Sequence, residues 1–282
     1  MRYKLFDAFT NKPFQGSSTA VVYWEAPVDR ARVQEIAREL AVRDTCFLMP
    51  PSEPDCLFAS LTFTPFGELS ICGQGMVAAA FALHDDGVIG RGEYTVQTAI
   101  GRRSVRIEDE DGPVAWINLG VPDIQPVSAT QFTTARDGLR LGDARIVRAR
   151  YVDLGRRRLF LQVELETLPR CEPSAARVLD TCTGLEVTGI VFAADAGEGE
   201  WHQRHFARSL CGDEDPVTGG AAASLLAFAR QGAPGQRPQQ LTIHQGGFAT
   251  RRGLLYARWD AAASAPLVGG RAVKIAEGRL LL

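Results

Sequence analysis

The chain has 282 residues, of which 45% are hydrophobic and 23% charged, and its formal net charge is −2. This is the composition of a globular protein, and the length suits two compact units of ordinary domain size. The small net charge argues against a nucleic-acid partner, because binding to phosphates needs clustered excess Lys and Arg. The one basic run, Arg156-Arg157-Arg158, lies between two apolar segments that resemble strands, so we expect a solvated turn there.

Membrane and metal partners are not expected either. The first residues contain no apolar run of signal-peptide length, and no stretch approaches the ~20 apolar residues that span a bilayer. We therefore expect a cytoplasmic protein. The six cysteines show no CxxC motif and no His at zinc spacing, so we expect no metal site and mostly small core thiols.

The first half begins with two predicted strands, 4–9 and 20–24. A helix is predicted over 32–40, because apolar residues recur there at helical spacing and Asp29 is available as its cap. A strand is expected at 45–49, directly after Asp44. Further on, we expect strands at 57–64, 94–98, 102–108 and 114–119, a turn-rich loop at 65–75, an Ala-rich helix at 76–84, and a crossover between halves from 122 to about 142.

The second half repeats this order of elements. A helix is predicted at 174–180 with Ser174 as its cap, and a second Ala-rich helix at 221–230 follows a loop over 207–220. Strands are expected at 146–154, 159–165, 187–193, 201–206, 241–245 and 251–259, and the last two close the sequence.

Two loop-helix units match in register. The first reads Cys72-Gly73-Gln74-Gly75 and the second Thr218-Gly219-Gly220-Ala221, each after a strand that ends in Phe. This correspondence predicts a duplicated fold. Each unit places Gly-rich backbone at a helix start, where unpaired N–H groups and the helix dipole favour an anion such as a carboxylate. The alternative is that the glycines serve tight packing of the helix.

Three side chains are candidates for chemistry. Asp44 lies where a helix passes into a strand, a common place for functional groups, although it also suits the simple end of a helix. Asp215 precedes the second helix start, where a carboxylate is also favourable to the dipole alone. Cys72 is a candidate nucleophile or base if the helix start favours its thiolate, and otherwise a small core residue. His202 and His205 are expected in surface or packing roles.

Motifs for cofactors are missing from the sequence. There is no GxGxxG after a strand, no P-loop and no GxSxG elbow. Gly73-Gln74-Gly75 lacks the third glycine of a dinucleotide site. We therefore expect no cofactor.

Several motifs occur together and in order along the chain. They are Phe6-Asp7-Ala8-Phe9-Thr10, Asp44-Thr45-Cys46-Phe47, Phe63-Thr64-Pro65, Cys72-Gly73, Glu214-Asp215-Pro216-Val217-Thr218-Gly219 and Gln245-Gly246. The ordered set resembles the PhzF-like isomerases of phenazine biosynthesis, from the first residues almost to the last.

The resemblance implies an α+β fold of the diaminopimelate epimerase-like type. Such a fold has two pseudo-symmetric half-domains, each a curled, mostly antiparallel sheet around a central helix, with the active site between them. We assign residues 1–125 to the first half and 126–282 to the second, with chain ends that are free to cross over. The resemblance also implies a homodimer.

The resemblance places the catalytic acid at Asp44. Family members move a proton with one Glu, and Asp shortens its reach by one methylene, about 1.5 Å. In the epimerase branch two cysteine acid/bases occupy the positions of Cys72 and Thr218, so this chain keeps the first alone. Cys72 therefore remains a secondary acid/base candidate, and a symmetric two-cysteine racemase is not expected.

Other positions depart from the family pattern. Gln74 replaces a His, Gly220 replaces a Ser, and Ser17 stands in a Gly-Ser-Ser segment where the family has Gly-Asn-Pro. The residues expected to bind a small carboxylate-bearing substrate are Ser17, Gly73, Gln74, Gly75, Asp215, Gly219 and Gly220.

The predicted function is a cofactor-independent isomerase that shifts a proton or double bond on a small unsaturated or amino-acid-like carboxylic acid. Natural-product biosynthesis, such as the formation of alkylproline units of antibiotics, is the expected setting. Two alternatives stay open: an amino-acid racemase or epimerase, and a catalytically inactive protein that binds small molecules.

Overall fold

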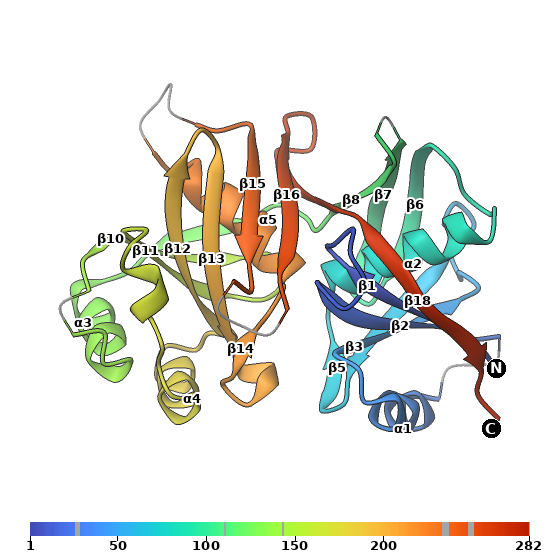
Figure 1. Ribbon diagram of the computed structural model, residues 1–282, viewed down its shortest axis with the longest axis horizontal. Helices are drawn as coiled ribbons and strands as arrows, with labels where there is room; N and C mark the ends of the chain where they lie inside the picture. Colours follow the sequence, from blue (N-terminus) through green and yellow to red (C-terminus); the bar gives the residue numbers. More distant parts are fainter. Residues whose placement is uncertain (26–28, 110, 143, 233–236, 248–250, 282) are drawn as a thin grey trace. The chain divides into compact units, whose positions relative to one another are not determined.

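The structure of the protein is a computed structural model (Figure 1). It describes residues 1–25, 29–109, 111–142, 144–232, 237–247 and 251–281. The chain divides into two compact units, Met1–Leu119 with Leu267–Leu282, and Gly120–Pro266. The first unit therefore ends before residue 125, which is the end of the first half expected from the sequence. The last segment of the chain belongs to the first unit again.

The first unit is a curled sheet around one helix, α2 (Gly73–Asp85). Helix α2 contacts strands β1, β2, β3, β7, β8 and β18, and Figure 1 shows β1, β2 and β18 running across it. The strands of this unit are β1 (Arg2–Ala8), β2 (Ser17–Tyr23), β3 (Asp44–Met49), β4 (Ala59–Thr64), β5 (Gly67–Leu69), β6 (Gly92–Thr98), β7 (Gly101–Asp109), β8 (Pro113–Asn118), β17 (Ala265–Gly270) and β18 (Ala272–Arg279).

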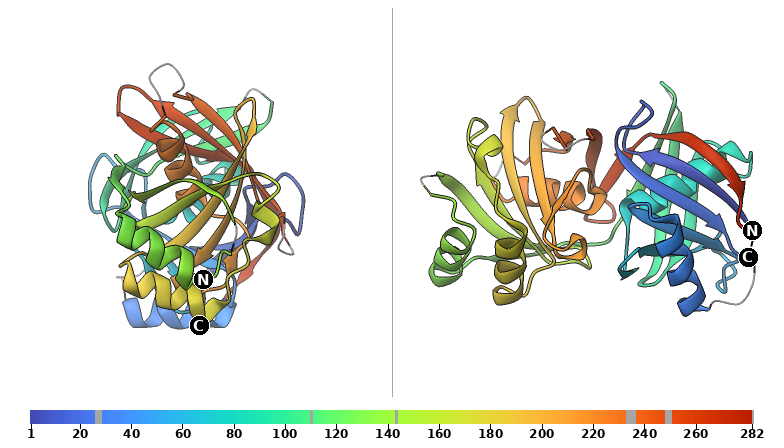
Figure 2. Two further views of the ribbon diagram at one scale, coloured as in Figure 1. Left: turned by 90° about the vertical axis from the view of Figure 1, so that its left-hand side faces the viewer. Right: turned by 60° about the horizontal axis from the view of Figure 1, so that its bottom comes forward.

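Strand pairing in the first unit is mostly antiparallel. One run of neighbours is β18-β1-β2-β3-β4-β5, and the other is β4-β6-β7-β8-β17. The pairs β2–β3 and β4–β6 are parallel. Helix α1 (Arg30–Leu40) packs on the opposite side of β3 and β4 from α2, and Figure 2 shows it outside the sheet.

The second unit has the same plan around helix α5 (Gly219–Ala229). Helix α5 contacts β10, β11, β15 and β16, while α3 (Ala129–Gly138) and α4 (Ala175–Gly184) pack together away from it. The strands are β9 (Asp123–Pro126), β10 (Ile146–Asp153), β11 (Arg158–Val163), β12 (Gly189–Gly197), β13 (Glu200–Ala207), β14 (Glu214–Asp215), β15 (Gln240–Gln245) and β16 (Gly253–Asp260).

Pairing in the second unit follows the order β9-β10-β11-β12-β13-β15-β16, with β14 beside β13. The pairs β11–β12 and β13–β15 are parallel, as are their counterparts β2–β3 and β4–β6 in the first unit. The duplication expected from the two loop-helix units is thus visible in the sheet topology.

The two central helices are apolar on every side, which suits burial inside a sheet rather than at a surface. Alanines dominate both helices, and residues 73–83 of α2 are buried throughout. Small side chains let the surrounding strands approach closely. The peripheral α1 instead buries one stripe, Val33, Ile36 and Ala37. Asp29 caps this helix as predicted, because its side chain accepts the backbone N–H groups of Ala31 and Arg32.

Several elements were not expected from the sequence, among them the short strands β5 and β14 inside the two predicted loops. Helix α3 and strand β9 occupy the segment expected to be a crossover, and β17 and β18 follow the strand that was expected to close the chain. Strand β17 contains Gly269 and Gly270, which are typical of turns. Their missing side chains make room for aromatic rings, because a Cβ would lie 2.5 Å from the Trp116 ring and 2.3 Å from the Phe9 ring respectively.

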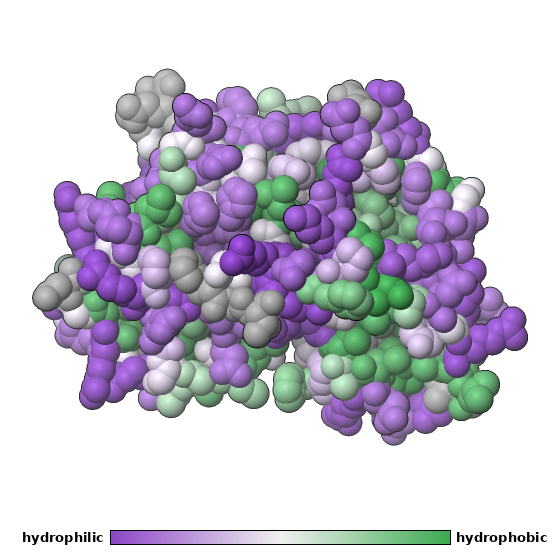
Figure 3. Space-filling model, in the orientation of Figure 1, coloured by the Kyte–Doolittle hydropathy of each residue, from purple (hydrophilic) through white to green (hydrophobic). Residues whose placement is uncertain are grey.

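The surface is mixed in character. On the face drawn in Figure 3, hydrophilic residues alternate with smaller apolar areas. None of the helices in the described ranges combines the length and the apolar character needed to cross a membrane. Five of the six cysteines are buried and all are free thiols, which agrees with the expected core role for most of them.

Candidate active site

Three of the predicted site residues meet inside the first unit. Asp44, the first residue of β3, is 2% exposed. Its Oδ2 accepts a hydrogen bond from Gln74 Nε2 in the first turn of α2, and Gln74 Nε2 also donates to Ser17 Oγ at 3.1 Å. We call Ser17, Asp44 and Gln74 the Asp44 cluster. A carboxylate, an amide and a hydroxyl from three different elements are thereby joined in one buried site.

The backbone fixes the place of Ser17 in this cluster. Gly16 precedes it with φ +65°, a left-handed conformation that favours glycine. A Cβ at Gly16 would lie 2.1 Å from the carbonyl oxygen of Ala8, so no other residue fits without moving β1. Ser17 therefore opens β2 in one defined position, directly after this turn.

The wall beside Asp44 is apolar and electrically neutral. Cys46 lies two residues further along β3, on the same face as Asp44, and is fully buried, whereas Phe47 packs against α1 on the other face. Burial raises the pKa of the Cys46 thiol to about 12, and the nearby Asp44 charge adds to that shift. Cys46 therefore stays a neutral thiol, which leaves the carboxylate of Asp44 as the candidate acid/base on this strand.

Cys72 and Gly75 have structural roles at the start of α2. Cys72 is the N-cap residue, and its Sγ accepts the N–H of Gly75 at 3.4 Å. A Cβ at Gly75 would lie 2.8 Å from Thr62 Oγ1, so the glycine lets the helix approach β4. The N–H of Gly75 is thus used inside the protein. The backbone N–H groups of Gly73 and Gln74 remain as the candidate anion-binding groups of this turn.

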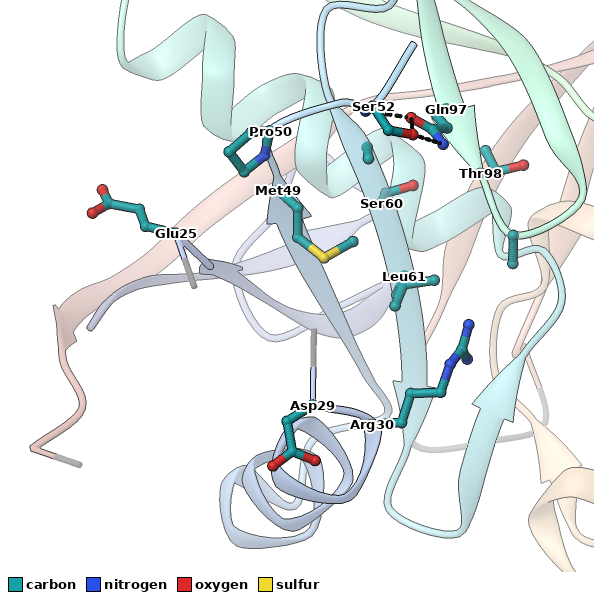
Figure 4. A pocket seen from close by; sticks show the side chains of 12 residues that line it. Glu25, Asp29, Arg30, Met49, Pro50, Ser52, Ser60, Leu61, Gln97 and Thr98 are labelled. Carbon is teal, nitrogen blue, oxygen red and sulfur yellow. Dashed lines mark hydrogen bonds between the residues drawn. The ribbon is translucent and has the colours of Figure 1, made fainter. Parts of the chain in front are cut away.

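A separate cavity lies at the other end of β3. It has a volume of about 1000 Å³, and Met49, Leu61, Arg30 and Gln97 are among its lining residues (Figure 4). Asp44 begins β3 whereas Met49 ends it, and none of the Asp44 cluster lines this cavity. The cavity is therefore distinct from the Asp44 cluster.

In the second unit, the polar residues form a continuous hydrogen-bond network. Thr218, which precedes α5, donates from Oγ1 to Asp215 Oδ2 at 2.7 Å and lies 2.8 Å from His205 Nδ1. Gln245 Nε2 donates to Thr218 Oγ1 at 3.1 Å and to the carbonyl of Asp215 at 2.7 Å. All four side chains are buried. We call His205, Asp215, Thr218 and Gln245 the Thr218 network.

Glu214, the carboxylate next to Asp215 in the sequence, has a structural role. Glu214 makes a two-point ion pair with the buried Arg204, at 2.9 Å from Nε and 2.8 Å from Nη2. Arg204 also donates to the carbonyl of Pro169 at 3.0 Å. Glu214 thus holds β14 to β13, and Asp215 is the carboxylate that reaches the Thr218 network.

Gly220 lies against a buried guanidinium at the start of α5. A Cβ at Gly220 would lie 3.1 Å from Arg158 Nη2, and Arg158 is 3% exposed. The glycine therefore makes room for positive charge at a helix end that already favours anions. A serine at this position would press on the guanidinium.

The expectation of a solvated turn at the basic run is therefore wrong. The turn exists between β10 and β11, but its arginines are used in contacts. Arg157 lies over the ring of Tyr151 at 4.1 Å and Arg156 donates to Ser209 Oγ at 3.1 Å, while Arg158 is buried. A charge run read along the sequence does not reveal which member turns inward.

Sequence reasoning also missed His205 and Gln245 as members of the site. His205 was expected in a surface or packing role, whereas it is 2% exposed and hydrogen-bonded to Thr218. Gln245 belongs to the Gln245-Gly246 motif, which by itself predicts no role for the side chain. A weak signal existed for His205, because His202 and His205 are an odd number of residues apart and a strand places them on opposite faces.

The pH dependence of stability should reveal the buried imidazole. Burial lowers the pKa of His205 to about 4. The imidazole is therefore protonated near pH ~6.5 in the unfolded chain but only at about pH 4 in the folded protein. We expect the free energy of unfolding to fall as pH drops through this window, and to fall less steeply in His205→Asn. Urea denaturation at several pH values measures this.

His202 provides the control for that measurement. Burial and the neighbouring His244 also lower the pKa of His202, so it adds to the slope with the same sign, but it lies outside the Thr218 network. His202→Asn should keep most of the wild-type slope. Equal slopes in wild type and His205→Asn would show that His205 does not titrate as described.

The fold and these sites define the class of protein. Each unit has a curled sheet around a central helix, as in the diaminopimelate epimerase-like fold, and solved structures agree. A probable proline racemase from Agrobacterium radiobacter superposes with a TM-score of 0.68 over 100% of this chain and 93% of that one, at 12% identity.

The chain belongs to the phenazine biosynthesis-like (PhzC-PhzF) family, whose model matches residues 6–278. The PhzF-family protein of Bacillus anthracis has a TM-score of 0.83 at 23% identity, covering 100% of this chain and 99% of that one. A predicted epimerase of Pseudomonas aeruginosa gives 0.82 at 25% identity over the same shares.

Curated relatives of the chain are named as isomerases. Trans-2,3-dihydro-3-hydroxyanthranilate isomerase of Pseudomonas aeruginosa is 28% identical over 291 residues, covering 100% of this chain and 99% of the relative. The uncharacterized isomerase YddE of Escherichia coli O157:H7 is 30% identical over 231 residues, covering 79% and 76%. The protein is accordingly an isomerase of this family.

Proposed function

We propose that Asp44 is the acid/base of a cofactor-independent isomerase that moves a proton between two carbon atoms of a small carboxylic acid. The observation that carries this proposal is the Asp44 cluster, in which a buried carboxylate is held by an amide beside an apolar wall. The amide of Gln74 cannot act as an acid or base at neutral pH, so the carboxylate of Asp44 is the member of the cluster that we assign to proton transfer.

The reaction balances without any added reagent. Asp44 takes a proton from a C–H bond, and the electrons of that bond form a new double bond to the neighbouring carbon. An existing double bond shifts along the conjugated system, and the protonated Asp44 returns its proton to the far end. The product has the same atoms as the substrate, with the double bond and one hydrogen displaced.

Gln74 is proposed to orient Asp44. Its Nε2 donates to both Asp44 Oδ2 and Ser17 Oγ, which uses the hydrogens of that amide nitrogen inside the cluster. A hydrogen bond to one carboxylate oxygen fixes the direction in which the other points. Orienting the base in this way lowers the entropy cost of reaching the reacting C–H bond.

We propose that the carboxylate of the substrate is bound at a helix start. The N–H groups of Gly73 and Gln74 in the first unit are candidates, as are those of Gly219 and Gly220, where Arg158 adds a full positive charge. Such fixed donors also stabilise negative charge that develops when the adjacent C–H bond is broken.

The substrate class is proposed to differ from that of the named isomerase. The family resemblance places a His and a Ser where this chain has Gln74 and Gly220. Gly220 lies directly against the buried guanidinium of Arg158. A site rebuilt in this way suits another unsaturated or cyclic amino-acid-like carboxylate. A double-bond shift in a cyclic imine acid on the way to an alkylproline unit of an antibiotic is the substrate class that we propose.

The proposal is tested by incubating the protein in D2O with a panel of unsaturated acids, cyclic imine acids and amino acids, followed by NMR. A shifted double bond with deuterium at one carbon supports the isomerase. Exchange with inversion and no double-bond shift would identify a racemase. Binding without exchange for every ligand that binds would identify a binding protein.

The Cys72→Ala variant separates the isomerase from cysteine chemistry. Cys72 accepts the N–H of Gly75, so its loss should weaken the helix cap and lower the free energy of unfolding by about 1 kcal/mol. Turnover should stay within about threefold of wild type, because a carboxylate and not a thiolate moves the proton. A loss of turnover of about 100-fold would instead assign the proton transfer to Cys72.

A further inference from the structure

The hydrogen positions in the Thr218 network follow from groups that can only donate or only accept. The backbone N–H of Thr218 donates to Gln245 Oε1 at 2.9 Å, which fixes the orientation of that amide. Gln203 Nε2 donates to the same oxygen at 2.7 Å. Gln245 Nε2 must then be the donor to Thr218 Oγ1 and to the carbonyl of Asp215.

This assignment determines the state of His205. The Thr218 hydroxyl has one hydrogen and two acceptor lone pairs. Its hydrogen lies toward Asp215 Oδ2, and Gln245 uses one lone pair. The other lone pair faces His205 Nδ1 at 2.8 Å, so Nδ1 carries a hydrogen. With Asp215 as a carboxylate, the reverse arrangement would leave Thr218 Oγ1 and Asp215 Oδ2 2.7 Å apart with no hydrogen between them.

The surroundings of the ring suit a neutral imidazole with an unprotonated Nε2. Within the described residues, Nε2 is buried and has no hydrogen-bond partner. It lies against Gly189, where a Cβ would be 2.4 Å away. Burial is the largest single cause of the lowered pKa of this ring, Arg158 and Arg156 act in the same direction, and Asp215 opposes them. An N–H at Nε2 would be a buried donor without an acceptor, which is costly.

We propose that His205 is a positioning residue that sets the state of Asp215 through Thr218. The Nδ1–H group of His205 directs the Thr218 hydroxyl toward Oδ2 of the Asp215 carboxylate, which thereby keeps its role as a hydrogen-bond acceptor. A substrate group that contacts Asp215 must therefore be a donor. The inference rests on the proposed function for the role of Asp215, while the state of the ring is independent of it.

Nitrogen NMR of the histidine side chains tests the ring state without any substrate. In the uniformly ¹⁵N-labelled protein, His205 should show a protonated Nδ1 and a bare Nε2, unchanged from about pH 5 to about pH 8. Thr218→Val should shift the Nδ1 signal, whereas His202→Phe should leave it unchanged. A protonated Nε2, or titration of His205 near pH ~6.5, would overturn the proposal.

Matched variants test the positioning role. Asn can place an amide N–H where Nδ1 lies, while Phe keeps the size of the ring and removes the donor. We expect His205→Phe to lower kcat/KM by about 10- to 100-fold, the loss of one hydrogen bond in a charged network, and His205→Asn to recover most of it. The substrate is the compound that gives isotope exchange in D2O with the wild type.

The same variants separate the possible failures. If His205→Phe is poorly folded, His205→Asn and Thr218→Val still report on the network. The double variant His205→Phe/Thr218→Val should be no worse than Thr218→Val alone, because both act through one hydroxyl. Additive losses, or full activity in both single variants, would refute the positioning role. Failure of Asp44 as the acid/base would leave the NMR result for His205 intact.

Discussion

Replacing Asp44 by Asn is expected to lower turnover by about 100- to 10,000-fold, the range that one general acid/base contributes. Asn has the same shape as Asp, and its carbonyl oxygen can still accept the hydrogen bond from Gln74 Nε2. The variant therefore removes proton transfer while keeping the Asp44 cluster in place. Steady-state kinetics together with deuterium incorporation on the same substrate measure the effect.

Asp44→Glu is the matched control for that experiment. It keeps a carboxylic acid and lengthens the side chain by about 1.5 Å, restoring the acid that the family resemblance implies at this position. We expect activity between wild type and Asp44→Asn, because the acid is present but displaced from its fitted position. Near wild-type turnover in Asp44→Asn would show that another group moves the proton.

Replacing Arg204 by Met is expected to lower the free energy of unfolding by about 3–5 kcal/mol, the cost of leaving one member of a buried ion pair without its partner. Arg204 makes a two-point pair with Glu214 and donates to the carbonyl of Pro169. Methionine fills most of the space but returns none of these hydrogen bonds. Urea denaturation measures the loss from the midpoint and the slope.

Two comparisons make the Arg204 prediction specific. Arg145→Met removes an exposed pair with Glu164 and should change stability little, because solvent screens such pairs. Asp215→Asn should impair turnover more than stability, although Asp215 adjoins Glu214. Equal stability of Arg204→Met and Arg145→Met would contradict the structural role assigned to Glu214.

The sequence predicted the elements whose causes are local. Asp29 precedes an amphipathic helix and caps it, and Asp44 begins a strand where that helix has ended. The Ala-rich segment in each half of the chain forms a central helix, α2 or α5, because a helix that is apolar on every side must be covered by a sheet. Ser17 and Gln74 were singled out as site residues, and the structure brings both to Asp44.

The missed features have causes that lie far away in the chain. Strand β17 contains two glycines because rings of Trp116 and Phe9 occupy the space of their side chains. Arg158 is buried in space that a side chain at position 220 would restrict. His205 is likewise buried in space that a side chain at position 189 would occupy. None of these pairs is visible in local composition. Helix α3 is the exception, because its capping box of Ser128 and Gln131 is a local signal in the sequence.

The most direct test of the central claim is to follow a deuterium label placed on the donor carbon of the substrate. A single buried carboxylate that takes and returns the same proton should deliver part of the label to the acceptor carbon of the product, on the same face, and Cys72→Ala should not change that fraction. Delivery of solvent hydrogen alone, on the opposite face and dependent on Cys72, would contradict the assignment of Asp44 as the proton carrier.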